Sequence, residues 1–157
     1  MPVIAPVAED SAILAAQVLL REYGRWLRAT QSCGTNYPVL DTEIACMPAT
    51  YTNRNGEVLL ALLDGQPAAC IAYRALPDTP TECEIKRLYV RPAFQGRGLA
   101  RALVAEALTR AGTRHFTRAI LDTDTSTMPA AHALYLSLGF REYSRRDGAL
   151  AFLDRNL

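Results

Sequence analysis

The chain has 157 residues, which is enough for one domain with one substantial core and too few for two. Half of the residues are hydrophobic and 21% are charged, a balance that is typical of a globular protein and excludes a disordered or fibrous chain. Seventeen basic and sixteen acidic residues give a net charge of +1, so we expect a single domain over residues 1–157 and no nucleic-acid partner.

The chain is expected to begin with a short strand over residues 2–6, followed by a helix. From Asp10 onward, apolar residues recur at spacings of three and four and predict one amphipathic helix. Its apolar stripe consists of Ile13, Ala16, Leu20, Tyr23 and Leu27. Asp10 or Ser11 is expected to cap the helix, because a short oxygen-bearing side chain can accept from the exposed N–H groups. Residues 30–56 are interrupted by glycine and proline, and they leave room for a short helix near residues 41–46.

A β-hairpin is the clearest prediction of the middle of the chain. Two apolar runs, Glu57–Leu63 and Pro67–Tyr73, flank the dipeptide Asp64-Gly65. That dipeptide readily adopts the positive φ values of a tight turn. The apolar run Cys83–Val90 predicts a third strand after an intervening loop.

A helix and a strand are expected next. The spacing of leucine, valine and alanine predicts a helix from Gly98 to Ala111. Gly112 is expected to end this helix in a left-handed conformation. Residues 118–123 predict a strand, because they centre on a short apolar run.

The remaining chain predicts one more helix and two strands. The helix spans residues 129–138, and we expect Ser126 or Thr127 to cap it. Residues 140–143 and 149–153 can pair as terminal strands. Taken together, the order of helices and strands predicts one α/β domain with a mixed sheet.

The cysteines and the N-terminus bear on the compartment. Cys33, Cys46, Cys70 and Cys83 lack metal-ligand spacing, so we expect no metal. Cys70 and Cys83 lie in apolar, strand-like runs and are expected to be reduced and buried. The N-terminus lacks the features of a signal peptide, and no run of about 18 apolar residues could span a membrane. We therefore expect a cytoplasmic protein without a membrane partner.

One segment, residues 83–100, carries a pattern with chemical meaning: a strand, a turn with two glycines and a helix. A helix N-terminus has unpaired N–H donors and a partial positive charge, which favour phosphate. Gly96 and Gly98 remove side chains where the backbone would approach an anion, and Arg97 and Arg101 add positive charge. The segment therefore predicts a seat for a diphosphate.

Two nucleotide-binding motifs could explain such a seat. A P-loop is excluded, because Gly-Lys-Ser/Thr is missing. A dinucleotide-binding fold remains as an alternative, since Gly96-x-Gly98 follows a strand and Asp122 ends the next strand 24 residues after Gly98. Against it, Arg101 occupies the third glycine position, and only one strand–helix–strand unit follows.

The same residues resemble a known family. Gln95-Gly96-Arg97-Gly98-Leu99-Ala100 resembles the Q/R-x-x-G-x-G/A loop of the GCN5-related N-acetyltransferases (GNAT). Leu88-Tyr89-Val90 resembles the strand that leads into that loop, and residues 131–140 resemble the family's A-x-x-L-Y-x-x-x-G-F segment. The resemblance implies the GNAT fold, a mixed, mostly antiparallel twisted sheet flanked by helices. It also implies an N-acetyltransferase.

The resemblance further implies that acetyl-CoA is the cosubstrate. The loop would hold the coenzyme diphosphate, and the strand before it would pair with the pantetheine arm. The implied coenzyme-binding residues are Leu88, Tyr89, Val90, Gln95, Gly96, Arg97, Gly98, Leu99, Ala100 and Arg101. In this family the strand before the loop diverges from the strand after the main helix, and the acyl group lies in that gap. Tyr135 would lie near the thioester sulfur.

A mechanism follows from the chemistry of acyl transfer. An amine attacks the thioester carbonyl only as the neutral species, so a base must accept a proton. Glu84 is the candidate, directly or through water, and by strand alternation it is expected to share a face with Lys86 and Leu88. The phenol of Tyr135 can protonate the departing thiolate. N–H groups near Leu88 can polarise the carbonyl oxygen.

Several alternatives stay open in the sequence. Met128 stands where the family often has an asparagine, so a non-catalytic acyl-CoA-binding sensor is the second hypothesis. Glu84 could be a salt-bridged strand residue, and Asp122 and Asp124 could bind a cationic substrate or cap a turn. The acceptor is an amine of a small molecule or peptide whose identity no motif reveals. The oligomeric state is also open, a homodimer included.

Overall fold

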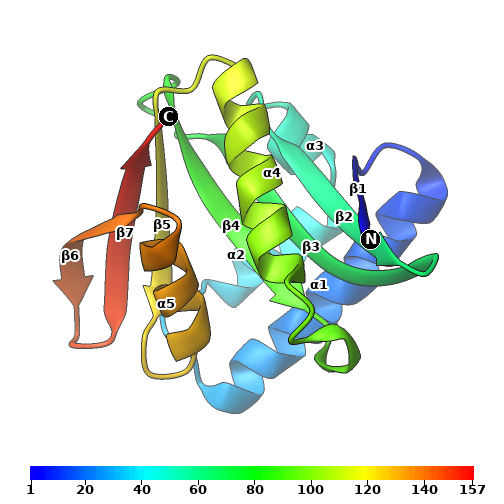
Figure 1. Cartoon of the computed structure of the whole chain (residues 1–157), viewed down its shortest axis with the longest axis horizontal. Helices are drawn as coiled ribbons and strands as arrows, with labels where there is room; N and C mark the ends of the chain where they lie inside the picture. Colours follow the sequence, from blue (N-terminus) through cyan, green and yellow to red (C-terminus); the bar gives the residue numbers. More distant parts are fainter.

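A computed structural model of the protein describes all 157 residues (Figure 1). The seven strands form one sheet in the order β1-β2-β3-β4-β5-β7-β6, and every pair of neighbours is antiparallel except β4 and β5. This confirms the mixed, mostly antiparallel sheet. In chain order the elements are β1 (Val3–Pro6), α1 (Asp10–Thr30), α2 (Tyr37–Ala45), α3 (Ala49–Thr52), β2 (Glu57–Leu63), β3 (Gln66–Ala75), β4 (Glu82–Val90), the 3₁₀ turn η1 (Pro92–Phe94), α4 (Leu99–Thr113), β5 (Arg118–Asp124), α5 (Pro129–Ser137), β6 (Arg141–Arg146) and β7 (Leu150–Asn156).

Helices cover both faces of the sheet and create two hydrophobic clusters. The helices α4 and α5 pack on one face, whereas α1, α2 and α3 lie on the other (Figure 1). Strand alternation supplies both clusters from the same strand. On β2, Leu59 and Ala61 belong to the cluster under α4, and Val58 and Leu60 belong to the cluster under α1.

The helix α1 follows its predicted stripe but not its predicted cap. Ala16, Leu20 and Leu27 are buried in the cluster on its face of the sheet. Glu9 occupies the N-cap position without a side-chain hydrogen bond, so the assignment of Asp10 or Ser11 was wrong. Asp10 lies instead in the first turn, where its negative charge interacts favourably with the positive end of the helix dipole. Although α1 has 21 residues, no helix here combines the length and apolar character needed to cross a bilayer.

The short helix expected near residues 41–46 is α2, which begins four residues earlier, at Tyr37. Asn36 caps it, because the Asn36 side chain accepts a hydrogen bond from the Val39 N–H at 3.2 Å. Pro38 lies in the first turn, where its missing N–H costs nothing. A proline that suggested a break in the sequence therefore helps to start the helix.

The expected hairpin is present, and its turn has the predicted geometry. Asp64 and Gly65 both adopt positive φ, 52° and 76°, between β2 and β3. The end of α4 differs from expectation, because Gly112 remains helical and His115, with φ of 68°, takes the left-handed conformation.

The start of α5 also differs from expectation, because the predicted capping hydroxyls are bonded elsewhere. Met128 is the N-cap residue, and its side chain accepts no capping hydrogen bond. The Ser126 hydroxyl donates to Asp124 at 2.6 Å, and the Thr127 hydroxyl pairs with Ser32 at 2.7 Å. Contacts with β5 and the chain after α1 thus override the local capping preference.

A β-bulge in β4 reverses the alternation of its side chains. Between the pairs Ala72↔Lys86 and Cys70↔Tyr89, β4 holds one residue more than β3, and Arg87 has a φ of 63°. Leu88 therefore packs toward the cluster under α4, and Tyr89 toward the cluster under α1. The expectation that Glu84 shares a face with Leu88 was wrong for this reason.

All four cysteines are free. Cys70 and Cys83 are buried, as their apolar surroundings predicted, whereas Cys33 and Cys46 are exposed. The buried Cys70 thiol donates to the Arg87 carbonyl at 3.7 Å, so it contacts the bulge.

Candidate functional site

The sheet opens between β4 and β5. The two strands pair at only three positions, from Glu82↔Arg118 to Glu84↔Ile120, although β4 continues to Val90. Beyond Glu84, the edge of β4 that faces β5 has no strand partner. Its N–H and C=O groups can therefore pair with an extended ligand, as in strand addition. This confirms the divergence that the family resemblance implied.

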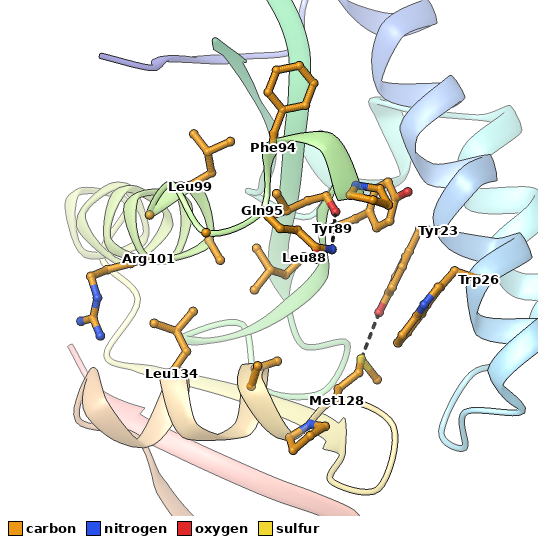
Figure 2. A pocket seen from close by; sticks show the side chains of 18 of the residues that line it. Tyr23, Trp26, Leu88, Tyr89, Phe94, Gln95, Leu99, Arg101, Met128 and Leu134 are labelled. Atoms are coloured by element: carbon orange, nitrogen blue, oxygen red, sulfur yellow. Dashed lines mark hydrogen bonds between the residues drawn. The ribbon is translucent and has the colours of Figure 1, made fainter.

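A cavity of about 690 Å³ lies at this opening (Figure 2). It is bounded by the end of β4, the turn before α4, the start of α5 and one side of α1. Its size falls within the range of small-molecule sites, and 12 of its 19 lining residues are hydrophobic. The lining includes nine residues predicted to bind the coenzyme: Leu88, Tyr89, Val90, Gln95, Gly96, Gly98, Leu99, Ala100 and Arg101.

The turn between β4 and α4 has the geometry of an anion seat. Gly96 and Gly98 have φ of 77° and 78°, and a Cβ added at either position would meet no atom within 4 Å. The helix α4 starts at Leu99, and its first backward hydrogen bond runs from the Ala102 N–H to the Gly98 carbonyl at 3.1 Å. The N–H groups of residues 99–101 are therefore free at the positive end of the helix. Bare backbone, free donors and open space fit the diphosphate of a coenzyme.

Side chains complete the rim of this seat. The Arg101 guanidinium donates to the Ser137 hydroxyl at 2.8 Å and so reaches from α4 to α5 (Figure 2). Gln95 donates to the Val90 carbonyl at 3.3 Å, which ties the turn to β4. Arg97 does not line the cavity, and its guanidinium lies 5.9 Å from the centre of the Phe94 ring.

An aromatic wall, formed by Tyr23 and Trp26 of α1, faces the loop across the cavity. Neither residue was among those predicted for the site. Tyr23 and Trp26 of α1 stack with ring centres 6.3 Å apart, and Tyr23 also contacts the Tyr89 ring at 5.5 Å (Figure 2). The Tyr23 hydroxyl donates to the Met128 sulfur at 4.0 Å, and burial raises the pKa of Tyr23 to about 12. Tyr23 followed the helical stripe and looked like core. The usable signal was a tryptophan three residues later on the same helix face.

Tyr135 lies behind the cavity wall. It is 7% exposed, and its ring packs edge-on against Phe140 at 5.8 Å. Its helix neighbours Ala131 and Leu134 line the cavity directly. Burial, assisted by the charges of Tyr23 and Asp122, raises the pKa of Tyr135 well above its usual range. The phenol therefore stays protonated at neutral pH.

Glu84 lies at the last β4–β5 pair and does not line the cavity. Its carboxylate accepts from Arg74 Nε at 2.7 Å and lies 3.7 Å from an Arg54 nitrogen and 4.0 Å from Lys86 Nζ. These ion pairs match the alternative of a salt-bridged strand residue. Glu43 of α2 joins the same network through Arg74 at 3.0 Å.

The two aspartates at the end of β5 differ in their surroundings. Asp124 is 2% exposed and accepts from the N–H groups of Cys33 and Ser126. Burial acts to raise the pKa of Asp124, but these hydrogen bonds and the Ser126 hydroxyl hold it well below its usual range. Asp124 thus caps a turn, whereas the Asp122 side chain is exposed to solvent. No three His, Cys, Asp or Glu side chains of the protein gather as metal ligands would.

Comparison with known proteins places this geometry in a family. The model of the acetyltransferase (GNAT) family matches residues 20–140. Human N-acetylaspartate synthetase is 34% identical over 136 residues, which cover 85% of this chain and 43% of that protein. The chain therefore spans less than half of the length of that relative.

Solved structures agree on the fold. A GNAT-family acetyltransferase from Staphylococcus aureus matches with a TM-score of 0.80 and 15% identity over 99% of both chains. The protein yncA from Salmonella typhimurium, solved with its cofactor acetyl-CoA, matches with a TM-score of 0.76 and 20% identity. That match covers 99% of this chain and 94% of yncA, and at such identities both structures show a shared fold alone. The family match over most of the chain decides the assignment: this protein belongs to the GNAT acetyltransferase family.

Proposed function

We propose that the protein transfers an acetyl group from acetyl-CoA to a primary amine of a small molecule or peptide. One observation carries the proposal: an anion seat at residues 96–101 and an unpaired strand edge at Leu88–Val90 line the same cavity. A diphosphate joined to an extended arm with amide groups, as in coenzyme A, matches both features. The shared fold with yncA, which was solved with acetyl-CoA, supports the same substrate.

The proposed chemistry is direct acyl transfer. The amine nitrogen attacks the thioester carbonyl carbon, the carbon–sulfur bond breaks, and the nitrogen loses a proton to a carboxylate. The Leu88 N–H lies on the unpaired edge and is the proposed donor to the carbonyl oxygen. The carboxylates next to the opening are Glu84 and Asp122. Glu84 remains in the proposal as a group acting through water, because Arg74 holds one of its oxygens at 2.7 Å and the other oxygen has Lys86 only at 4.0 Å.

Tyr135 is the proposed proton donor to the departing thiolate. Its raised pKa keeps the phenol protonated at neutral pH, which is the form that can donate a proton, while the same shift makes it a weaker acid. Tyr135 is buried behind Ala131 and Leu134, which line the cavity, so the phenol is kept away from bulk water.

The proposal also covers the acceptor and the cellular compartment. The name of the human relative makes aspartate the first acceptor to test. Four unpaired cysteines are compatible with a reducing, cytoplasmic compartment. A non-catalytic acyl-CoA-binding module is the competing proposal, and the replacement of an expected asparagine by Met128, held by Tyr23, favours it.

The decisive experiment measures release of free coenzyme A thiol from acetyl-CoA with a panel of amines. We expect turnover by the wild type and, for Tyr135→Phe, a kcat about 10²- to 10⁴-fold lower with acetyl-CoA affinity retained. Tyr143→Phe is the matched control, because Tyr143 is 49% exposed on β6 and outside the cavity. Tight acetyl-CoA binding without turnover across the panel would instead identify the sensor.

A further inference from the structure

Three charged side chains meet on the open sheet face next to the split. Lys86 and Asp122 each lie two residues beyond the last β4–β5 pair, Glu84↔Ile120, so they face each other across the opening. Asp122 pairs in register with Phe152 of β7. The Arg146 guanidinium of β6 lies 5.1 Å from the centre of the Phe152 ring, which brings it toward Asp122 from the other side.

All three side chains point to the same face. The residues that flank Asp122 and Phe152 in sequence, such as Leu121 and Leu153, belong to the cluster under α4. Strand alternation therefore turns Asp122 and Phe152 to the opposite face, which Lys86 shares because it precedes the bulge at Arg87. Asp122 and Arg146 are exposed there.

These charges are not engaged within the protein. The Asp122 carboxylate takes part in no hydrogen bond and no ion pair, and the Arg146 guanidinium contacts only the Phe152 ring. Lys86 forms one ion pair, with Glu84, at the outer limit of 4.0 Å. The adjacent network is different, because Glu43 accepts from both Arg74 and Arg87 at about 3.0 Å and satisfies them. The open face therefore holds one carboxylate and two cations that a ligand can pair with.

We infer that this face is the acceptor site and that the acceptor is an amino acid, a small molecule carrying both an amine and a carboxylate. The inference rests on the proposed acetyl transfer. Asp122 binds the amine, and Lys86 and Arg146 bind the carboxylate. As the new nitrogen–carbon bond forms and the carbon–sulfur bond breaks, the Asp122 carboxylate takes the proton that the nitrogen releases, and Tyr135 protonates the sulfur.

The electrostatics of Asp122 agree with this role. Desolvation by neighbouring protein atoms raises the pKa of Asp122 above its usual value although its side chain reaches solvent, and Lys86 and Arg87 oppose the rise. Asp122 in turn contributes to the raised pKa values of Tyr23 and Tyr135. It therefore lies within electrostatic reach of both the cavity wall and the proposed proton donor. Glu84, in contrast, is held by Arg74.

The test compares amino acids with their own amides as acceptors. Thiol release is measured with L-aspartate and glycine and with the corresponding amides, glycinamide and L-aspartic acid diamide. We expect the wild type to prefer the acids by about tenfold or more in kcat/KM, because each amide lacks the carboxylate that the two cations would bind. Lys86→Gln and Arg146→Gln should each lower kcat/KM for the acids about tenfold and so reduce the preference for acids over amides.

Further variants separate the roles. Asp122→Asn should lower kcat about 100-fold or more for acids and amides alike. Arg145→Gln is the control, because Arg145 is the neighbour of Arg146 on the other face of β6 and is paired with Glu142 at 2.6 Å. Equal use of acids and amides, or wild-type turnover by Asp122→Asn, would overturn the inference.

A binding measurement distinguishes failure of the inference from failure of the proposed function. In the presence of coenzyme A, L-aspartate should raise the melting temperature of the wild type and not that of Lys86→Gln. If thiol release is absent but this shift is present, the enzyme proposal fails and the amino-acid site stands. If thiol release occurs with simple amines and L-aspartate gives no shift, the enzyme proposal stands and the amino-acid site is wrong.

Discussion

Gly98 and Gly65 have nearly the same backbone conformation, but only Gly98 lies in the cavity. Their φ values are 78° and 76°, and an added Cβ at either position would meet no atom within 4 Å. Gly65 belongs to the tight turn between β2 and β3, whereas Gly98 precedes the free N–H groups of α4. Comparing substitutions at these two glycines therefore separates the effect of backbone strain from the effect on ligand binding.

We predict that Gly98→Ala and Gly65→Ala each lower the free energy of unfolding by about 1–2 kcal/mol, because both place a Cβ at positive φ. Only Gly98→Ala should also weaken acetyl-CoA binding, by about tenfold or more, since its methyl group would enter the anion seat. Denaturant unfolding and isothermal titration calorimetry measure the two effects. Equal affinities of the two variants for acetyl-CoA would argue against a diphosphate at this turn.

Residues whose conformation depends on local sequence could be predicted, and those whose contacts depend on distant partners could not. The turn at residues 96–101 is local, because its conformation and its free N–H groups follow from two glycines before a helix. Glu84 is not local. Its direction relative to Leu88 depends on a bulge, and its availability depends on Arg74 from another strand.

The helix α2 is joined to the bulge of β4 by a buried ion-pair network. The Glu43 carboxylate lies 2.9 Å from an Arg87 nitrogen and 3.0 Å from an Arg74 nitrogen, and it accepts from the Tyr51 hydroxyl at 2.7 Å. The Glu43 side chain is 4% exposed. Burial acts to raise the pKa of Glu43. Arg87, Tyr51 and Arg74 together have the larger effect and lower the pKa, so the carboxylate stays ionised. This network holds Arg87 in its left-handed conformation next to the cavity.

We predict that Glu43→Ala lowers the free energy of unfolding by about 3–5 kcal/mol, because it leaves the buried Arg87 without its carboxylate partner and Arg74 with Glu84 alone. Asp41→Ala on the same helix is the control. Asp41 pairs with Arg28 at 3.4 Å on the surface, and such exposed pairs contribute about 0–1 kcal/mol. Chemical denaturation of both variants gives the comparison, and similar losses would mean that the buried network adds no more than a surface pair.

Apolar runs indicated the strands, and helical periodicity indicated the long helices. The ends of these helices depended on contacts that a single sequence does not show. The caps of α1 and α5 were predicted wrongly. For α5, the hydroxyls of Ser126 and Thr127 bond to Asp124 and to Ser32, 95 residues away from Thr127. Trp26 and Tyr23 share a helix face, which the sequence shows, but that they face β4 and α5 across a cavity follows only from the fold.

The whole molecule consists of two groups of strands that meet at a weak point in the sheet. Strands β1–β4 and strands β5, β7 and β6 are joined by only three registered pairs between β4 and β5. The helices α4 and α5 contribute to one core cluster with both groups. A ligand in the cavity contacts the end of β4, α4 and α5, so it would bridge the two groups.

We predict that acetyl-CoA at 100 times its dissociation constant adds about 2.7 kcal/mol to the free energy of unfolding. It should slow hydrogen exchange most at the amides of residues 88–90 and 99–101, because these are the groups it would bond. Exchange within β1 and β2, outside the cavity, serves as the internal control. NAD is the comparison ligand, and equal stabilisation by NAD would revive the dinucleotide-binding alternative.

The overall architecture was predictable because the order of helices and strands, together with two local motifs, limits the fold to few choices. The proposed acceptor face was not predictable. It combines Lys86, Asp122 and Arg146 from three strands, and their approach depends on the split and on the register across Phe152. Such an arrangement leaves no pattern of fixed spacing in the sequence.

The split has one more consequence, for association between copies of the chain. An unpaired strand edge invites aggregation, yet the free edge of β4 lies in the middle of the sheet, shielded by β5 and the cavity wall. The two outer edges are unsuitable templates, because β1 has four residues and ends in Pro6, whereas β6 carries four charged side chains. The protein thus offers an open backbone to a small ligand while denying one to another polypeptide.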